Sequence, residues 1–424
     1  MIYRALSHPL VRTLRSLTGN ARASVYTEPM WGIPYNLYAT YISIYMRDLG
    51  LKDVQIGLIA SIGLFFQIIA AMSSGIITDK LGRKRVTLVF DILAWSVPCL
   101  IWAVAQNFYF FVAAAIVNSL WRVTMNSWTL LMVEDTDQEL LVDIYSWVYI
   151  SGQLAAFFAP LAGLLISAYS LVPTMRGLYI FAFIMMTAKF FVLNKYVRET
   201  DQGEVRMQET RNQSLFTMFS EYRGLIGKVL KAPSTLFTVG IMLVMGASQM
   251  ITGTFWGLLV TEKLKLPAEH LAFYQFARSA TMLLFFFLVM PHIREMRFRN
   301  PMLVGFAGFA ISQLLLITIP PQNYALLLLS TLIEACAIAT LGTQVDRMAV
   351  VTVEAKERAR IMAFVYVVAI LFTTPFGWIA GSLSEINRNL PFILNLFLFA
   401  FGAALTFFSA RQPTNLPIEA LGTP

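Results

Sequence analysis

The sequence predicts an all-α polytopic membrane protein, with twelve transmembrane helices arranged as two pseudo-symmetric six-helix bundles. The 424-residue chain has 57% hydrophobic and only 13% charged side chains, whereas a soluble domain carries about 25% charged residues. Apolar stretches recur along the whole length, and a stretch of about 18 residues or more can cross a bilayer as a helix. Several features of the first half also return in the second. Lipid is therefore expected to surround most side chains.

The apolar stretches divide equally between the two halves of the chain. In the first half they lie near 29–48, 54–79, 86–105, 107–132, 144–169 and 174–196. In the second half they lie near 234–261, 267–291, 300–319, 323–349, 359–383 and 389–409. An even number of spans places both ends of the chain on the same side of the membrane.

Basic residues predict the orientation, because cytoplasmic loops carry an excess of lysine and arginine. One set of connections holds most of them: the N-terminal segment, Lys80 with Arg83–Arg85, Lys195–Lys231, Arg294–Arg299, Arg347–Arg360 and Arg411. We therefore expect a multi-pass protein of the cell membrane (plasma or inner membrane) with both termini cytoplasmic. The predicted domains are a cytoplasmic segment (1–28), a first bundle (29–197), a cytoplasmic linker (198–233), a second bundle (234–410) and a cytoplasmic tail (411–424).

Composition also argues against several classes of protein. The net charge of +8 comes from basic residues in short connections rather than on one soluble face, so nucleic acid is not an expected partner. Cys99 and Cys336 lie in apolar runs of different halves and imply no disulfide framework. The three histidines, His8, His270 and His292, lack the spacing of metal ligands. We expect no metal and no cofactor, and no phosphate-binding loop for ATP is present.

The two halves resemble each other at an offset of 215 residues, the distance from Pro160 to Pro375. The basic loop at Arg83 has a counterpart at Arg297 in the second half. Between the halves, apolar residues after Ser214 recur at helical spacing and predict an amphipathic helix in the linker. Duplicated halves are typical of transporters, in which one half rocks against the other around a central site.

A motif follows the second predicted span, in the segment Gly75-Ile76-Ile77-Thr78-Asp79-Lys80-Leu81-Gly82-Arg83-Lys84-Arg85. Gly75, Asp79, Gly82, Arg83 and Lys84 match a glycine, an acid, a turn glycine and two basic residues at fixed spacing. This segment resembles the signature loop of the major facilitator superfamily, which lies at the same place between helices 2 and 3. The resemblance implies that family's fold and alternating-access transport.

The motif suggests a gating role for its charged residues. Asp79 and Arg83 can form charge-assisted bonds across the cytoplasmic interface between the halves, which would hold the outward-facing state. The family resemblance adds an acid at the cytoplasmic end of helix 4 as a partner of the basic loop, and Glu134 and Asp135 occupy that region. The second-half copy near Arg297 lacks the acid and the glycine, so any latch there is weaker.

A charged side chain within a membrane span has a free-energy cost, so such residues are candidates for function. Asp91 lies 15 residues before Gln106, in the turn of a predicted hairpin, and Arg122 lies 16 residues after it, so the two can reach the same depth. They form either a structural ion pair or a pair that proton binding at Asp91 or substrate binding at Arg122 breaks. Lys189, on an outer helix by resemblance, is expected to extend to the cytoplasmic face.

Arg278 and Glu334 in the second half lie near the expected midplane. By the family resemblance Glu334 faces the central cavity, where desolvation favours loading a proton and Arg278 opposes it. Glu334 is therefore the strongest candidate for proton coupling, with a static pairing to Arg278 as the alternative. Candidates for lining the substrate cavity are Trp31, Tyr35, Asn36, Tyr38, Asn126, Gln249 and Trp256. Such aromatic and amide groups suit a moderately hydrophobic organic solute or a sugar.

Two partial family signatures bear on the direction of transport. Arg122 occupies the place of an intramembrane arginine found in proton-coupled members, although Asn126 replaces the usual glycine. Gly152, Pro160 and Gly163 resemble an antiporter signature, with alanines at other glycine positions. Such small residues also serve ordinary close helix packing.

The sequence therefore predicts a secondary active transporter, not an enzyme, that moves a small organic solute by alternating access with protons as the coupling ion. Export is slightly preferred. The alternative is a proton-coupled uptake symporter for a sugar or other metabolite. A remote alternative is a membrane-embedded enzyme that uses the Glu134, Asp135 and Asp137 cluster. The lipid bilayer is the expected environment, and a monomer is the expected state.

Overall fold

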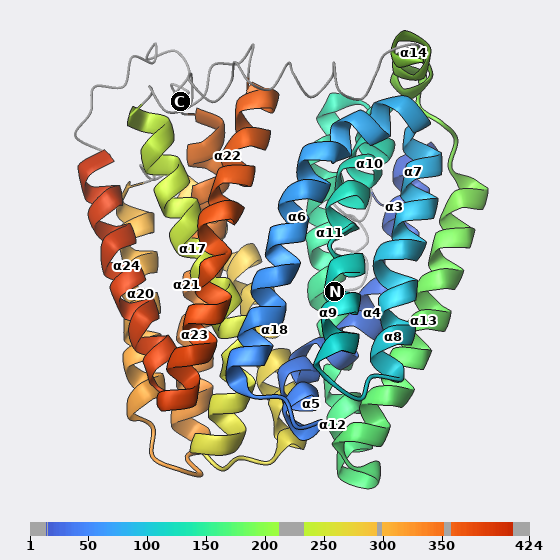
Figure 1. Cartoon of the computed structure of the whole chain (residues 1–424). Helices are drawn as coiled ribbons and strands as arrows, with labels where there is room; N and C mark the ends of the chain where they lie inside the picture. Colours follow the sequence, from blue (N-terminus) through green and yellow to red (C-terminus); the bar gives the residue numbers. More distant parts are fainter. Residues whose placement is uncertain (1–13, 15, 212–232, 295–298, 352–357, 410–424) are drawn as a thin grey trace, which may run out of the picture.

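The computed structural model describes residues 14, 16–211, 233–294, 299–351 and 358–409 (Figure 1). Long helices fill these ranges, as expected for apolar segments in lipid, where each backbone N–H and C=O must be bonded within its own helix. The expected amphipathic linker helix after Ser214, the N-terminal segment before Leu14, Arg297 and the tail lie outside the described residues.

The first half consists of helices that belong to six spans, with short 3₁₀ and π-helical turns in three of them. In chain order they are α3 (Gly19–Thr27), α4 (Pro29–Tyr38), η1 (Ala39–Tyr41), α5 (Ile42–Asp48), α6 (Asp53–Leu81), α7 (Arg83–Asp91), η2 (Ile92–Ser96), α8 (Val97–Ala103), α9 (Phe108–Asn118), α10 (Trp121–Val133), η3 (Gln138–Leu140), α11 (Leu141–Ala155), η4 (Ala156–Phe158), α12 (Ala159–Tyr169) and α13 (Leu171–Tyr196). The linker begins with α14 (Asp201–Thr210).

The second half repeats this arrangement with fewer interruptions. Its elements are α17 (Pro233–Leu258), η5 (Leu259–Lys263), η6 (Ala268–His270), α18 (Leu271–Leu288), α19 (Met290–Arg294), α20 (Arg299–Thr318), α21 (Tyr324–Val351), α22 (Arg358–Thr373), α23 (Pro375–Ile386) and α24 (Leu390–Ser409). The proline pair that marks the repeat lies at equivalent breaks. Pro160 is in the first turn of α12 and Pro375 in the first turn of α23, where a missing N–H is tolerated.

Within the described residues, eleven helices are long and apolar enough to cross a membrane. The predicted span at 29–48 is also helical, but it is divided into α4, η1 and α5 by a 3₁₀ turn at Ala39–Tyr41, and Pro34 lies inside α4. It provides the first helix of the first bundle (Figure 1). The predicted twelve-helix, two-bundle fold is thus confirmed, and the observed boundaries differ from the predicted ones by a few residues.

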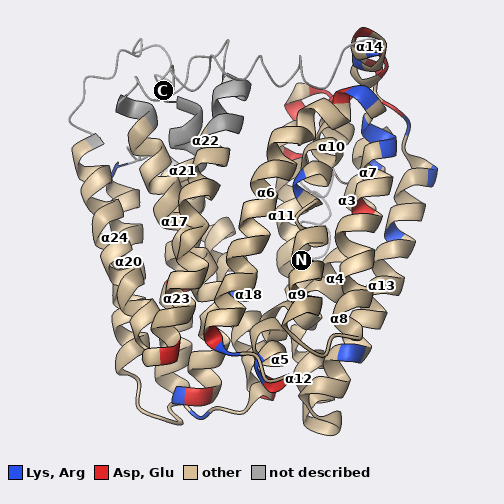
Figure 2. Ribbon diagram, in the orientation of Figure 1, with Lys and Arg blue, Asp and Glu red and all other residues tan. Residues whose placement is uncertain are grey.

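The two bundles stand side by side, with α6 and α23 in contact between them (Figure 1). Lys, Arg, Asp and Glu lie mainly at the two ends of the bundles, while the long middle stretches are almost free of them (Figure 2). We call the end that carries Arg83 and α14 the basic end, and the end that carries Asp53 the far end. The apolar core spans both bundles, and fully buried tyrosines and phenylalanines such as Tyr45, Tyr179 and Phe399 fill it.

Candidate functional site

The turn between α6 and α7 brings the signature loop together at the basic end. α6 ends at Leu81, and Gly82 then has φ +84°, a left-handed conformation that glycine adopts without strain. Gly82 also leaves room for a neighbour, because a Cβ there would lie 2.6 Å from the Glu199 carboxylate. α7 therefore starts directly at Arg83, whose side chain is only 3% exposed.

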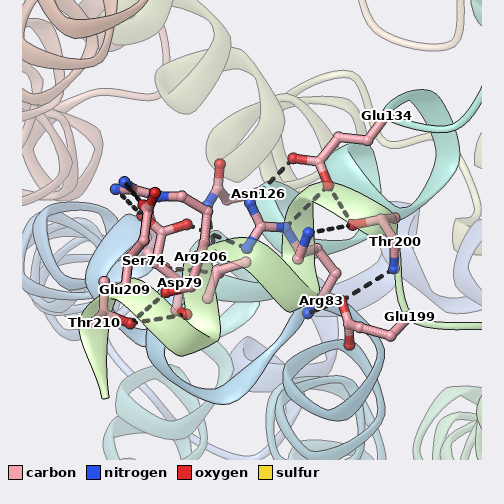
Figure 3. Close-up of polar contacts among 12 residues, drawn as sticks. Ser74, Asp79, Arg83, Asn126, Glu134, Glu199, Thr200, Arg206, Glu209 and Thr210 are labelled. Atoms are coloured by element: carbon pink, nitrogen blue, oxygen red, sulfur yellow. Dashed lines mark hydrogen bonds and ion pairs between the residues drawn. The ribbon is translucent and has the colours of Figure 1, made fainter. Parts of the chain in front are cut away.

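Arg83 is held by acids from three segments (Figure 3). Its guanidinium donates two parallel bonds to Glu134, with Nε–Oε2 and Nη2–Oε1 distances both 3.0 Å. Nη1 lies 3.2 Å from the Asp79 carboxylate, one turn earlier. The backbone N–H groups of Arg83 and Lys84 donate to Glu199 at 2.8 and 3.0 Å. Bidentate, charge-assisted contacts of this kind fix a geometry as well as stabilise it.

The start of the linker completes this arrangement, which the sequence did not predict. α14 is capped by Thr200, whose hydroxyl accepts from the Gly203 N–H and donates to Glu134. Arg206 on α14 then bonds Asp79 at 2.9 Å, and this hydrogen bond raises the Arg206 pKa. We call these residues, Asp79, Arg83, Glu134, Glu199, Thr200 and Arg206, the loop cluster.

The loop cluster lies within the first half and its linker. Glu134 faces Arg83 as the family resemblance implies, while the Asp135 carboxylate accepts from the Asp201 N–H at 3.3 Å. Partial desolvation and the neighbouring acids raise the pKa of Asp135. Among the described residues, the ion-pair partners of Asp79 and Arg83 all belong to the first half or to α14. The expected latch across the halves is therefore not formed by these pairs in this structure.

A second group of charges, at the far end, does join the halves. Asp53, at the start of α6 and 2% exposed, pairs with Arg388 and accepts from Ser384 at 2.6 Å. Glu262, in η5, bonds Arg388 and also accepts from Arg47 Nε at 3.0 Å. Arg47 and Asp53 come from the first half, and Glu262, Ser384 and Arg388 from the second. We call these five residues the inter-half cluster; the sequence analysis did not identify it.

Glycines next to the inter-half cluster let the backbones of the two halves approach closely. A Cβ at Gly377 of α23 would lie 2.6 Å from the Gly57 carbonyl of α6, and one at Gly381 would lie 2.6 Å from the Asp53 carbonyl. Ser61 of α6 donates to the Thr374 carbonyl at 2.6 Å and accepts from the Trp378 N–H at 2.9 Å. Small residues at helix contacts are the usual way to achieve close packing in membranes.

The halves also contact each other where α12 meets η6, and this contact involves the partial antiporter signature. Gly163 of α12 packs against the Glu269 carbonyl of η6, where a Cβ would clash. Gly152, in contrast, has open space around its Cα. Gly163 thus has a packing role between the halves, and the structure gives Gly152 no such role.

A cavity of about 450 Å³ lies within the first bundle. Half of its lining residues are aromatic: Trp31, Tyr35, Tyr38, Trp95, Trp102, Trp121 and Trp128. Trp31 stacks on Tyr35 with centroids 4.8 Å apart and meets Trp95 edge-on at 4.9 Å. Three charged side chains also line it, Glu28, Asp91 and Lys189. We call it the tryptophan cavity, and its size falls in the usual range for ligand sites.

The charged residues of the first bundle pair differently from the expected pattern. Lys189 is 4% exposed and lies 3.2 Å from Glu28, so the expectation that it extends to the cytoplasmic face is wrong. Arg122 donates to Gln67 at 3.1 Å and stacks on Trp121 at 4.1 Å. Asp91, 5% exposed, faces the cavity near Lys189 and Thr124 instead of Arg122. Glu28 and Lys189 were missed as a pair because 161 residues separate them in the sequence.

In the second bundle, Glu334 of α21 is 4% exposed, and the charge of Arg278 on α18 acts on it. No ion pair within 4 Å joins these two described residues, and the Arg278 guanidinium lies 5.8 Å from the Trp256 ring. Trp256 itself is buried against Tyr274. The structure therefore brings the two charges near each other without a direct bond.

The remaining cavity candidates have different environments. Asn36 donates to the Gly32 carbonyl at 2.8 Å in its own helix, and Asn126 donates to Thr78 at 3.4 Å. Gln249 is exposed on α17. Trp31, Tyr35 and Tyr38 are thus the predicted cavity residues that line the tryptophan cavity, and the other four tryptophans there carried no motif by which to select them.

Solved structures of transporters share this fold. The nucleoside transporter NupG matches with a TM-score of 0.70 and 16% identity, covering 93% of this chain and 98% of that chain. A POT family transporter in complex with 5-aminolevulinic acid matches with a TM-score of 0.67 and 13% identity, covering 92% and 94%. The human organic anion transporter MFSD10 (TETRAN) matches at 0.62 and 14%, covering 91% and 99%. At such identities the likeness concerns the fold alone.

No curated protein sequence matches the chain. The sequence model described as Major Facilitator Superfamily matches residues 32–349, which is three quarters of the chain and includes the signature loop. The chain therefore belongs to the Major Facilitator Superfamily of membrane transporters.

Proposed function

We propose that this protein is a secondary active transporter that moves a small organic solute across the cell membrane by alternating access. The observation that carries this proposal is the position of the contacts between the halves. Glycine contacts and the inter-half cluster join them at the far end, while the loop cluster at the basic end lies within one half. Two rigid halves joined by separable contacts at one end are what alternating access requires.

In this proposal the basic end faces the cytoplasm, as the positive-inside rule favours. Both chain ends and the linker then lie in the cytoplasm, and the far end faces outside. With this orientation, the inter-half cluster would close the protein toward the outside. Opening outward breaks its polar bonds, and contacts at the basic end replace them.

Protons are the proposed coupling ion, and the protein acts as a monomer. Glu334 is buried, and no described base lies within 4 Å of its carboxylate. Binding a proton therefore removes the free-energy cost of an unpaired charge inside the membrane. Asp91 has the same property in the first bundle. Export remains slightly preferred, with proton-coupled uptake as the second candidate. The enzyme alternative is not retained, since the family is one of transporters and Glu134 is bonded to Arg83 and Thr200.

The test is transport by the purified protein in proteoliposomes, for a set of organic solutes, with and without an imposed pH gradient. Gradient-dependent movement of at least one solute is expected. Glu334→Gln is expected to equilibrate that solute without accumulating it, because a neutral amide cannot carry the proton. Asp137→Asn, an exposed acid outside the cavity, serves as the control. Retained accumulation by Glu334→Gln rejects its coupling role, and a sample that moves nothing under any gradient rejects the proposal.

A further inference from the structure

The tryptophan cavity contains more acids than bases. Glu28, Asp91 and Lys189 line it, so the fully ionised set carries one net negative charge. Lys189 lies 3.2 Å from Glu28, and no ion pair within 4 Å joins Asp91 to any described base. Asp91 is only 5% exposed. The excess charge therefore belongs to a carboxylate that water hardly reaches, and a buried charge of this kind calls for a partner.

The other charged groups near Asp91 are already engaged or turned elsewhere. Arg122, on the neighbouring α10, donates to Gln67 and stacks on Trp121. Lys84, seven residues before Asp91 on α7, borders a separate small space with it rather than the tryptophan cavity. The titratable aromatic groups of the cavity, Tyr35 and Tyr38, carry no positive charge. A cation that enters the cavity would thus meet a carboxylate that accepts from Thr124 and has Lys189 near it, but that forms no ion pair within 4 Å with a described base.

The walls of the cavity favour a cation for a second reason. The faces of aromatic rings, tryptophan above all, attract positive charge, and the attraction grows when water is excluded. One cation already makes a cation–π contact with this wall, because the Lys189 ammonium lies 5.7 Å from the Trp128 ring. An anion would face the net negative charge and the negative ring faces together.

We propose that the tryptophan cavity is a binding site for an organic cation with apolar or aromatic groups, in which Asp91 pairs with the positive charge and the tryptophans surround the rest. This inference rests on the proposed transport function and names the class of solute. Lys189, the one base of the cavity, pairs with Glu28 and also lies near Asp91, so its single positive charge is shared by two carboxylates. The site therefore selects by charge first and by shape second.

The test uses two probes of the same shape and opposite charge, tetraphenylphosphonium and tetraphenylborate. Equilibrium binding to the purified full chain in non-ionic detergent is measured for each radiolabelled probe in separate samples, because the two ions form a poorly soluble salt when mixed. Tetraphenylborate is expected to bind at least about tenfold more weakly than tetraphenylphosphonium, whose binding is saturable. Asp91→Asn should weaken tetraphenylphosphonium binding about tenfold or more, because the partner charge of a desolvated cation is lost. Glu139→Gln, an exposed acid outside the cavity, should leave it unchanged.

Two further variants leave Asp91 in place and change only the count of charges. Glu28→Gln frees Lys189 to neutralise Asp91, so it should weaken binding like Asp91→Asn. The double variant Glu28→Gln/Lys189→Met restores one net negative charge and should bind within about threefold of the parent protein. The difference in binding between the single and the double variant tests the proposal even if Asp91→Asn does not fold. Equal affinity for both probes, or equal binding by the single and the double variant, overturns the inference.

The outcome is separate from that of the transport proposal. A protein that moves a neutral solute in proteoliposomes but does not bind tetraphenylphosphonium keeps its proposed function and loses the proposed solute class. A protein that binds the cation but moves nothing under any gradient keeps the site and loses the function.

Discussion

The two ends of the molecule use the same chemistry for different purposes. At the basic end, Arg83 is bound by Asp79 and Glu134 of its own half. At the far end, Asp53 and Glu262 meet arginines across the boundary between the halves. In the proposed alternating-access cycle, a guanidinium–carboxylate pair within one half persists, whereas a pair between the halves breaks when they separate. The position of an ion pair relative to the boundary, rather than its strength, thus predicts its role.

The largest expected effect comes from removing the centre of the loop cluster. The Arg83 side chain is only 3% exposed. Arg83→Met therefore leaves the carboxylates of Asp79 and Glu134 without the buried arginine that both contact. We expect the free energy of unfolding to fall by about 3 to 5 kcal/mol, as when one member of a buried pair is lost. Thermal unfolding in detergent measures this. Arg85→Met removes an exposed arginine two residues later and should change stability by less than about 0.5 kcal/mol. Equal losses in the two variants would contradict the comparison.

The next effect concerns the close contact between the halves. Gly57→Val places a side chain against the Gly377 carbonyl, and only in the state that is closed at the far end. Overpacking of this kind amounts to about 1 to 3 kcal/mol, so the closed state should lose roughly tenfold or more in relative population.

Ser384→Cys reports that population, because the side chain is 3% exposed in this state. The substitution also removes the bond to Asp53, so all rates are compared within the Ser384→Cys background. The reaction of this cysteine with a membrane-impermeant maleimide should speed up when Gly57→Val is added, in a background where Cys336 is serine. Gly152→Val is the matched control, because the structure shows open space there. An unchanged rate with Gly57→Val would mean that this contact does not separate during the cycle.

A smaller effect is expected for the inter-half cluster itself. Glu262→Gln removes the carboxylate shared by Arg47 and Arg388, but Glu262 is 34% exposed, so solvent screens the pair. We expect the closed state to weaken by about 1 kcal/mol, and the difference from the parent protein to shrink as salt is added. The same cysteine reporter measures it. Glu385→Gln, an exposed acid next to Ser384, should be without effect. A salt-independent change would point to packing rather than charge.

The smallest effect concerns the docking of α14 at the basic end. The side chain of Asp135 is exposed, but partial desolvation and the acids Asp201, Glu134 and Glu199 around it raise its pKa. The folded state then binds a proton more readily than the unfolded chain, so stability rises as pH falls from above the raised pKa toward the ordinary value of 3.8. Asp135→Asn should flatten this gain, by about 0.5 kcal/mol or less for an exposed residue. Unfolding temperatures across that pH range test it, with Asp137→Asn as control.

Sequence alone was sufficient for the fold, because hydropathy reports directly on contact with lipid. The apolar runs predicted the spans, and the Asp79 to Lys84 motif identified the family. The first span was placed correctly at 29–48, but its apolar pattern did not predict the 3₁₀ turn at Ala39–Tyr41 that divides it. This interruption leaves the apolar pattern intact while it changes the backbone.

The sites were less predictable, because they depend on which faces of distant helices meet. Equal depth suggested an Asp91–Arg122 pair, but depth does not fix rotation, and Arg122 instead faces Gln67. Glu28 lies just before the apolar run and reads as a boundary residue, yet it pairs with Lys189. Arg388 likewise reads as an ordinary loop charge. Only the packing of the two halves shows that it reaches Asp53.

Two of the residues argued to matter most stand at π-helical turns. Asp91 immediately precedes η2, and Glu262 lies inside η5. A π turn contains one residue more than the α turn that it replaces, so it can originate from a single-codon insertion into a regular helix. Deleting one residue from Ile92–Ser96 would restore an unbroken α-helix and rotate Asp91 by about 100° relative to the helix that follows. The proposed preference for organic cations would thus be gained or lost in one genetic step, without exchanging any amino acid.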